Sequence, residues 1–198
     1  RGEDNVYTTY GGTGGVPISS LFRRLLFSMR FRSFKILLSD DITNESRVMF
    51  HRRVSERIAR VAPFLQYDPE PYLVISNGRL FWVQDAYTTT SRYPYSTPAA
   101  NGVNYIRNSV KATVDAYNGT VTFYVIDTTD PIALTLQRIF PTLFRPVADM
   151  PEDMRTRLRY PHGIFALQAV MYATYHMTNS GVLYNKQAQG QGPVRDAG

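Results

Sequence analysis

The sequence predicts an α+β domain in which an antiparallel sheet of about four strands is packed by helices near both ends of the chain. Three features carry this prediction: two Asn-Gly dipeptides that each separate runs of strand formers, apolar residues at helical spacing near the N-terminus, and a long apolar helix near the C-terminus. A chain of 198 residues with 43% hydrophobic content can bury roughly 70% of the surface that it exposes when unfolded. We therefore expect one domain over residues 1–185, followed by a flexible or discontinuous tail over residues 186–198.

The first predicted element is a helix that begins near Pro17. Its inward face is expected to carry the apolar residues Ile18, Leu21, Phe22, Leu25, Leu26 and Met29. Its opposite face carries Arg23, Arg24, Phe27, Arg30 and Phe31. Because a solvated face would not normally carry two phenylalanines, we predict that this arginine/phenylalanine face contacts an anionic membrane surface or is covered by another part of a longer chain.

The middle of the chain predicts two β-hairpins. The run "YLVISNGRLFWVQ" places Asn77-Gly78 between strand formers, and this dipeptide accepts the positive φ angles of a type I′ turn. The run "VKATVDAYNGTVTFYVID" repeats the pattern at Asn118-Gly119. Counting outward from the second turn pairs Val114 with Phe123 on a core face and leaves a polar opposite face.

Three further helices are predicted before the C-terminal one. The first runs from about residue 44 to residue 62 and ends at Pro63. A short helix over residues 132–139 follows Asp130-Pro131, and another begins at Glu152.

The last predicted helix begins near Pro161 and ends before Gly181. It is apolar on almost every side, so we interpret it as central to the core. Gln168, Tyr172 and His176 recur every four residues along it and form a polar stripe. A hydrogen-bonded core network is favoured over a catalytic or binding role for this stripe.

Several kinds of site are excluded or unsupported. The chain has no cysteine, which removes disulfides, thiolate nucleophiles and cysteine metal ligands. We find no HExxH, GxSxG or P-loop motif, and therefore assign no catalytic residue, metal ligand or cofactor. The net charge of +6 makes an anionic partner reasonable. No apolar run reaches the ~18 residues of a spanning helix, so the chain as given is expected to be soluble.

The segment Asp85–Ser96, "DAYTTTSRYPYS", is expected to connect the two hairpins. Its tyrosines offer flat apolar faces with hydroxyl tips, and its arginine offers a fixed fork of donors, a mixture that can hold a sugar or a phosphate group. The same residues can also anchor a long loop on its own domain. The candidate ligand-binding residues are Tyr87, Thr88, Arg92, Tyr93, Tyr95 and His176.

Long stretches of the chain closely resemble a bacterial family of uncharacterised proteins, UPF0182. They are "GEDNVYTTYGGTGGVPISSLFRRLLF", "DPEPYLVISNGRLFWVQDAYTTTSRYPYS", "NYIRNSVKATVDAYNGTVTFYVID" and "MPEDMRTRLRYPHGIFALQAVMYATYHM". The resemblance extends to about Asn185 and implies a piece of a multi-pass plasma-membrane protein that lies outside the cytoplasm. It implies no catalytic residues, because no biochemical function is established for the family.

The resemblance shifts the expected partners. Nucleic acid is not expected. The expected partners are the rest of the same membrane protein and an envelope lipid, glycan or protein. We therefore expect a binding or assembly module. Two alternatives stay open: an enzyme acting on an envelope lipid or glycan, with His176 as acid or base and the Tyr87 to Tyr95 segment holding substrate, and an accessory domain of a transporter. The oligomeric state is not predicted.

Overall fold

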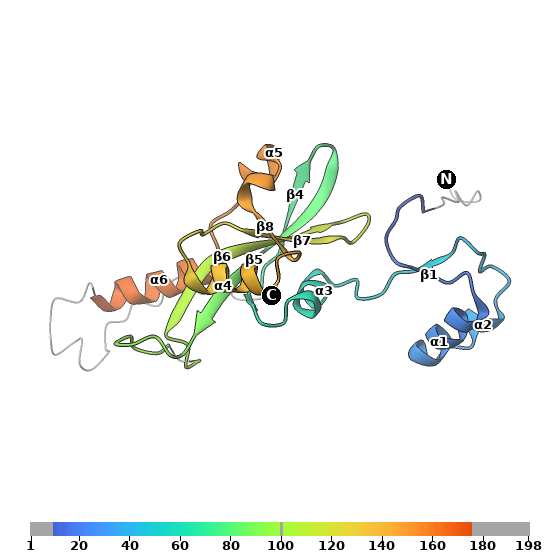
Figure 1. Ribbon diagram of the computed structural model, residues 1–198, viewed down its shortest axis with the longest axis horizontal. Coiled ribbons are helices and arrows are strands. Elements are labelled where there is room, and N and C mark those ends of the chain that lie inside the picture. Colours follow the sequence, from blue (N-terminus) through green and yellow to red (C-terminus); the bar gives the residue numbers. More distant parts are fainter. Residues whose placement is uncertain (1–9, 100, 176–198) are drawn as a thin grey trace, which may run out of the picture.

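The protein has an α+β fold built on one twisted mixed sheet (Figure 1). The computed structural model describes residues 10–99 and 101–175. The helices are α1 (Leu21–Phe31), α2 (Lys35–Leu38), α3 (Val54–Val61), α4 (Pro131–Ile139), the 3-10 helix η1 (Val147–Asp149), α5 (Glu152–Arg155) and α6 (His162–Tyr175). The strands are β1 (Val16–Pro17), β2 (Arg47–Val48), β3 (Gln66–Tyr67), β4 (Tyr72–Ser76), β5 (Arg79–Thr90), β6 (Tyr105–Asp115), β7 (Val121–Val125) and β8 (Phe144–Pro146).

The main sheet is larger than predicted and is not purely antiparallel. Its six strands follow the order β3-β5-β6-β7-β8, with β4 paired to β5, and β8 runs parallel to β7. The expectation of about four antiparallel strands was therefore wrong, although the α+β class is confirmed. Strands β3 and β8 have only two and three residues, too few for an alternating pattern to be recognised in the sequence.

The first predicted hairpin is confirmed in its turn and register. Asn77 has φ 49° and Gly78 has φ 73°, as a type I′ turn requires, and Ser76 pairs with Arg79. Predicting this turn from Asn-Gly works because both central residues lie in the left-handed region, which few other residues occupy at low cost.

The second hairpin has a different turn from the one predicted. Val114 pairs with Val121 instead of Phe123, and Asp115 and Thr120 enclose a four-residue loop. The carboxylate of Asp115 accepts hydrogen bonds from two backbone amides inside this loop, so its side chain fixes a wider turn. The register differs from the predicted one by two residues, and a shift of two leaves each side chain on its predicted face.

The first half of the segment predicted to connect the hairpins is a strand. Residues 85–90 belong to β5, which pairs with both β3 and β6, and the true connection is residues 91–104. The run of threonines favours this extended conformation because β-branched side chains fit a pleated sheet.

Both faces of the main sheet are covered. Helices α3 and α4 pack on one face, in a core that includes Ile58, Ala62, Val110, Ala112, Phe123, Ala133 and Phe144. The opposite face, predicted to be polar, carries a second core of Tyr72, Val74, Val83, Tyr124, Met150 and Met154, contributed partly by α5. Polar side chains of that face, such as Lys111 and Thr113, are buried as well, because the chain after η1 folds back over them.

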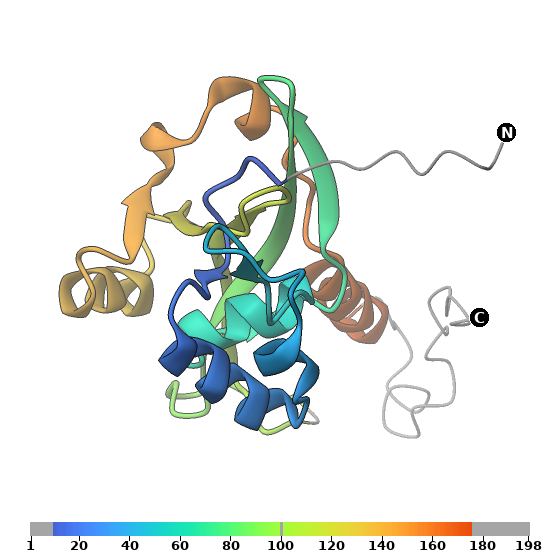
Figure 2. The same ribbon diagram turned by 90° about the vertical axis from the view of Figure 1, so that its right-hand side faces the viewer.

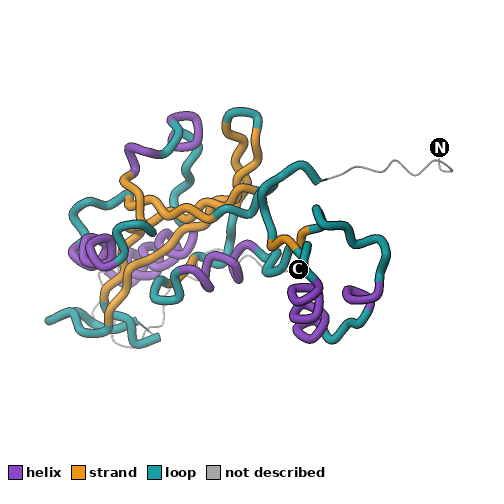
Figure 3. The backbone as a smooth tube through the Cα atoms, turned by 45° about the vertical axis from the view of Figure 1, so that its right-hand side comes forward, coloured by secondary structure: helices purple, strands orange, loops and turns teal. Residues whose placement is uncertain are grey.

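Helices α1 and α2 contact each other and lie apart from the main sheet (Figure 3). In Figure 1, α3 lies between them and the sheet, and Figure 2 looks along that direction with α1 and α2 in front. The second predicted helix is shorter than expected, because Arg47–Val48 pairs with Val16–Pro17 as β2 and α3 begins only at Val54.

Helix α6 is not central to the core described here. Only its first turn lies against the sheet, where the Gly163 amide donates to Asp68 at 2.8 Å. Most of the described side chains of the helix are exposed, among them Phe165 and Met171, whereas Ile164, Leu167 and Ala173 are half-buried. The interpretation of α6 as a core helix was therefore wrong for the described part of the chain, although the apolar pattern that prompted it is real.

Candidate functional site

The predicted ligand-binding residues separate into a buried group and an exposed group. Tyr87 and Thr88 lie inside β5 and are buried, whereas Arg92, Tyr93 and Tyr95 are exposed on the loop that follows. The sixth predicted residue, His176, lies outside the described residues. The structure thus does not bring Tyr87 and Thr88 into one pocket with the loop.

The loop between β5 and β6 is held in one conformation by Asn104. Its side-chain amide donates to the carbonyls of Tyr93 and Ser96 at 2.8 and 3.3 Å, and its oxygen accepts from the Tyr93 amide at 3.0 Å. The Tyr93 ring stacks on Tyr105, with ring centroids 5.2 Å apart. Tyr95 is fully exposed at a positive φ of 58°. A well-fixed loop that presents an exposed aromatic ring can contact a partner at low entropic cost.

Thr88 contributes to a buried carboxylate site at the start of α4. Asp130 is fully buried and accepts hydrogen bonds from Thr88, from Ser109 at 2.5 Å and from the Tyr105 hydroxyl at 2.9 Å. It also caps α4 by accepting from the Ile132 amide at 3.0 Å. Burial alone would raise the pKa of Asp130, but these hydrogen bonds hold it below its ordinary value. The arrangement explains Asp130 and Thr88 as structural groups.

Tyr87 contributes to a second buried carboxylate site, at the start of α6. Its hydroxyl donates to Asp68 at 2.5 Å, beside the Gly163 amide. Burial opposes ionisation of Asp68, yet the hydrogen bonds from Tyr87, Gly163 and Glu70 lower its pKa. Burial and the bond to Asp68 raise the pKa of Tyr87. Asp68 therefore ties the first turn of α6 to the sheet.

A small polar cleft of about 120 Å³ lies next to Asp68. Its lining residues are Asp68, Glu70, Pro71, Tyr72, Asp85, Arg159, Tyr160 and His162. Nearby, Lys111 is buried, forms an ion pair with Asp85 and donates to the Arg159 carbonyl at 3.1 Å. Burial lowers the pKa of Lys111 to about 8. A lysine of this kind can serve as a base. Here it links Asp85 of β5 to the Arg159 carbonyl, in the chain that leads into α6, which gives it a structural role.

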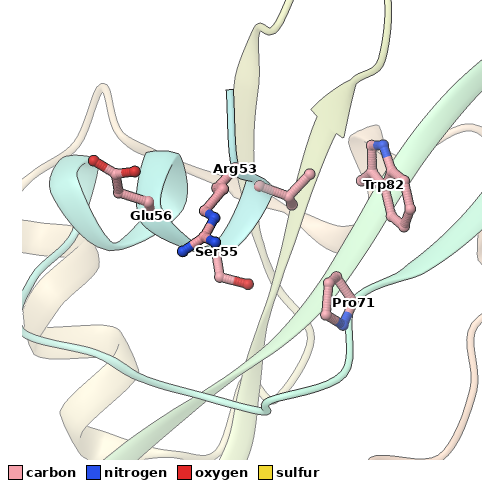
Figure 4. A pocket seen from close by; sticks show the side chains of 6 residues that line it. Arg53, Ser55, Glu56, Pro71 and Trp82 are labelled. Atoms are coloured by element: carbon pink, nitrogen blue, oxygen red, sulfur yellow. The ribbon is translucent and has the colours of Figure 1, made fainter. Parts of the chain in front are cut away.

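A larger, open cleft of about 640 Å³ lies between α3 and the start of β5 (Figure 4). Figure 4 shows Arg53, Ser55 and Glu56 on the helix, with Trp82 and Pro71 across from them. Behind Ser55, the Gln84 amide donates to Ser55 at 3.1 Å and to the Asp68 carbonyl at 2.6 Å. The Gln84 amide oxygen is buried and has no hydrogen-bond partner among the described residues.

The arginine/phenylalanine face of α1 is the face that packs against the chain. Arg23 and Arg24 donate to backbone carbonyls of Pro17, Ile18 and Ile42. Phe27 stacks on Phe31 at 5.9 Å between centroids and also contacts Phe50. Arg30 remains exposed. Of the apolar residues that were predicted to point inward, Ile18 is buried, but those within α1 are exposed, so the predicted orientation of α1 was wrong.

Neither a metal site nor a membrane span is found in the part of the chain that the structure describes. No helix between residues 10 and 175 is long and apolar enough to cross a membrane. Within the same limits, no three His, Cys, Asp or Glu side chains are grouped so that they could hold a metal ion.

The buried charged groups had only weak signals in the sequence. Asp130 was recognisable as a helix start because it precedes proline. Lys111 and Asp85 were not identified: each is one charged residue inside a strand, and only their pairing across β5 and β6 shows that they neutralise each other.

The chain matches the family model described as "Uncharacterised protein family (UPF0182)" over residues 1–197. The chain belongs to this family. A UPF0182 protein of Pelobacter propionicus is 54% identical over 191 residues, which are 96% of this chain and 21% of that protein. UPF0182 proteins of Bradyrhizobium diazoefficiens and Geobacter sulfurreducens are 52% and 51% identical, over 100% and 96% of this chain and 22% and 21% of theirs.

This UPF0182 chain spans about a fifth of the length of the curated relatives that it matches. The match confirms the family resemblance of the sequence motifs. No solved structure matches the chain.

Proposed function

We propose that this UPF0182 chain is an assembly module that attaches to the rest of a longer membrane protein through helix α6, outside the cytoplasm. The observation that carries this proposal is that α6 is apolar almost all round and yet mostly exposed over its described side chains. A helix of this composition is normally buried in a large core or in a membrane. The resemblance to multi-pass membrane proteins described above supports the location.

The exposed side chains of α6 point in different directions. Phe165 and Met171 are 58% and 50% exposed, and their positions lie roughly 120° apart around the helix axis. Burying one such side chain would contribute about 1.5–3 kcal/mol. The only amide side chain in the helix, Gln168, already accepts a hydrogen bond from Tyr160 at 2.8 Å. A partner for α6 therefore has to supply an apolar groove that surrounds the helix.

The rest of the same polypeptide is the partner that these observations favour. Helix α6 contains no Lys, Arg, Asp or Glu, so it lacks the charges with which an interfacial helix binds lipid headgroups. About four-fifths of the length of the relatives lies outside this chain, and that part is large enough to provide the groove.

Photo-crosslinking in the full-length protein tests this assignment. A photoreactive phenylalanine analogue replaces Phe165 or Met171, and mass spectrometry locates the products. We expect crosslinks to residues of the same polypeptide outside this chain. A matched probe at Thr97, which is exposed on the loop before β6, should give few such products. Products formed only with lipid or with other proteins would overturn the proposal.

The location has its own test, because the chain contains no cysteine. In a full-length background freed of other cysteines, Tyr95→Cys places one thiol at a fully exposed position. We expect a membrane-impermeant maleimide to label it in cells whose inner membrane is intact. Labelling only after that membrane is opened would place the module in the cytoplasm.

A second candidate function is recognition of an envelope glycan or phosphate group by Arg92, Tyr93 and Tyr95. The observation that favours it is the fixed loop with an exposed tyrosine at its tip. The enzyme alternative that uses His176 stays a prediction. Its other proposed participant, Tyr87, is buried against Asp68, which leaves only the exposed loop available to a substrate.

A further inference from the structure

Helix α1 carries a separate apolar stripe that points away from the rest of the described chain. Leu21, Phe22 and Met29 are 72%, 68% and 67% exposed. The docked side of the helix, around Phe27 and the buried Ser28, lies opposite the stripe when positions advance by 100° per residue. Helix α2 adds the exposed side chains Phe34 and Leu38 nearby.

The position of α1 leaves its stripe accessible. Helices α1 and α2 lie at the end of the molecule, beyond α3 as seen from the main sheet (Figures 1 and 3). Of the helices and strands, α1 has extensive contacts with α2 alone. A flat surface could therefore approach the stripe without displacing any described element.

The surroundings of the stripe are strongly cationic. Residues 16–39 contain five basic residues and no acidic residue. Arg30 and Arg23 lie along one edge of the stripe on the helix surface. Arg30, Arg32 and Lys35 are exposed, and none of the three forms an ion pair with another described residue. Helix α6, by contrast, has no such charges.

We propose that α1 lies in the plane of an anionic lipid surface, with its stripe among the acyl chains and its basic residues at the headgroup phosphates. An exposed apolar stripe beside unpaired basic residues is the combination by which interfacial helices bind such surfaces. A protein interface would instead be depleted of charge at its centre, and of lysine in particular. The 11 residues of α1 extend about 16 Å, so the helix lies on the membrane and does not cross it. The inference does not depend on the assignment of α6.

Binding of the chain to extruded vesicles tests the proposal. We compare vesicles of equimolar phosphatidylglycerol and phosphatidylcholine with vesicles of phosphatidylcholine alone, and measure the bound fraction by co-sedimentation. Phe22→Gln with Met29→Gln should weaken binding by on the order of tenfold or more. Both side chains are exposed in the free chain, so replacing them removes their apolar contacts with the acyl chains and leaves the fold intact. Arg30→Gln with Lys35→Gln should weaken it by about 25-fold, at roughly fivefold for each charge near the surface.

Matched controls separate the stripe from general effects. Arg138→Gln with Arg145→Gln removes the same net charge at exposed positions outside residues 16–39, and should change binding less than about twofold, since electrostatic attraction falls off within a Debye length. Ile75→Gln with Leu80→Gln removes two exposed apolar residues from the β4–β5 hairpin and should likewise have little effect. Circular dichroism and melting temperatures check that each variant is folded.

A depth measurement keeps the proposal testable if the Phe22 and Met29 variant does not fold. A nitroxide on Phe22→Cys should become shielded from a water-soluble relaxation agent when vesicles are added, whereas one on Tyr95→Cys should not. No preference for anionic vesicles would overturn the proposal. So would equal losses in the control variants, or self-association through the stripe without vesicle binding.

Discussion

Replacing Asp130 with alanine should destabilise this chain more than almost any other polar substitution. Asp130 has no exposed surface and accepts hydrogen bonds from three side chains and one backbone amide. Loss of a helix N-cap costs about 1 kcal/mol. A buried donor left without a partner costs about 1–3 kcal/mol. The hydroxyls of Thr88 and Ser109 can bond to each other, at 3.2 Å, so the Tyr105 hydroxyl is the main donor left unpaired.

These terms give a loss of about 2–4 kcal/mol in the free energy of unfolding. Urea unfolding followed by circular dichroism measures it. The control is Asp127→Ala, because Asp127 is only partly buried and pairs with Arg107 near the surface at 3.2 Å. Its loss should cost less than about 1 kcal/mol. A loss at Asp130 no larger than at Asp127 would refute the argument.

A second substitution at this position, Asp130→Asn, should change how stability depends on pH. The pKa of Asp130 is lower in the folded chain than its ordinary value, so the folded state binds this proton less readily than the unfolded state does. Its stabilising contribution is present above the unfolded pKa of about 3.9 and is lost as the pH falls through the folded pKa. Asp130→Asn should therefore lose less stability than the wild type between about pH 5 and pH 3. Equal losses would contradict the role given to the carboxylate.

Four further substitutions test individual features. Lys111→Met leaves Asp85 buried without its partner and should cost about 3–5 kcal/mol in urea unfolding, whereas adding Asp85→Asn should restore most of the loss; no recovery would argue against their pairing. Gly78→Ala adds a methyl group in open space at φ 73° and should cost about 1 kcal/mol. Gly119→Ala also brings its Cβ within 2.7 Å of an arginine side chain and should lower the melting temperature more than Gly78→Ala does. Equal losses in the two variants would argue against a steric contribution at Gly119. Asn104→Ala removes three hydrogen bonds from the loop before β6 and should speed proteolysis there without lowering the melting temperature by more than a few degrees.

The sheet was predictable where a local rule determines the backbone. Asn77-Gly78 requires positive φ at both residues, and few sequences other than Asn-Gly supply it cheaply. At Asn118-Gly119 the same dipeptide failed to predict the turn, because the side chain of Asp115 binds the loop amides and stabilises a four-residue connection. The face assignment survived that error, since side chains alternate with a period of two.

Most of the candidate site could not be predicted in the same way. Tyr87 and Thr88 have the composition of a binding loop, but each contacts a carboxylate that is distant in sequence, Asp68 and Asp130 respectively. Such partners are determined by the sheet register and by the return of the chain, which no local pattern encodes. Arg92, Tyr93 and Tyr95 were predicted to lie on a loop and do so, because proline and polar residues end the strand.

Helices α1 and α6 show that hydrophobic periodicity locates an apolar surface without identifying what covers it. Periodicity in α1 and α6 identified apolar surface, but it could not state whether this chain or a partner covers that surface. In α1 the apolar stripe is the exposed face, and Phe27 and Ser28 form the docked one. In α6, which is apolar all round, Phe165 and its neighbours are exposed. The two surfaces differ in charge, since α1 is flanked by arginines and α6 has none. Two surfaces so different call for different partners, which is why lipid is assigned to α1 and apolar protein to α6.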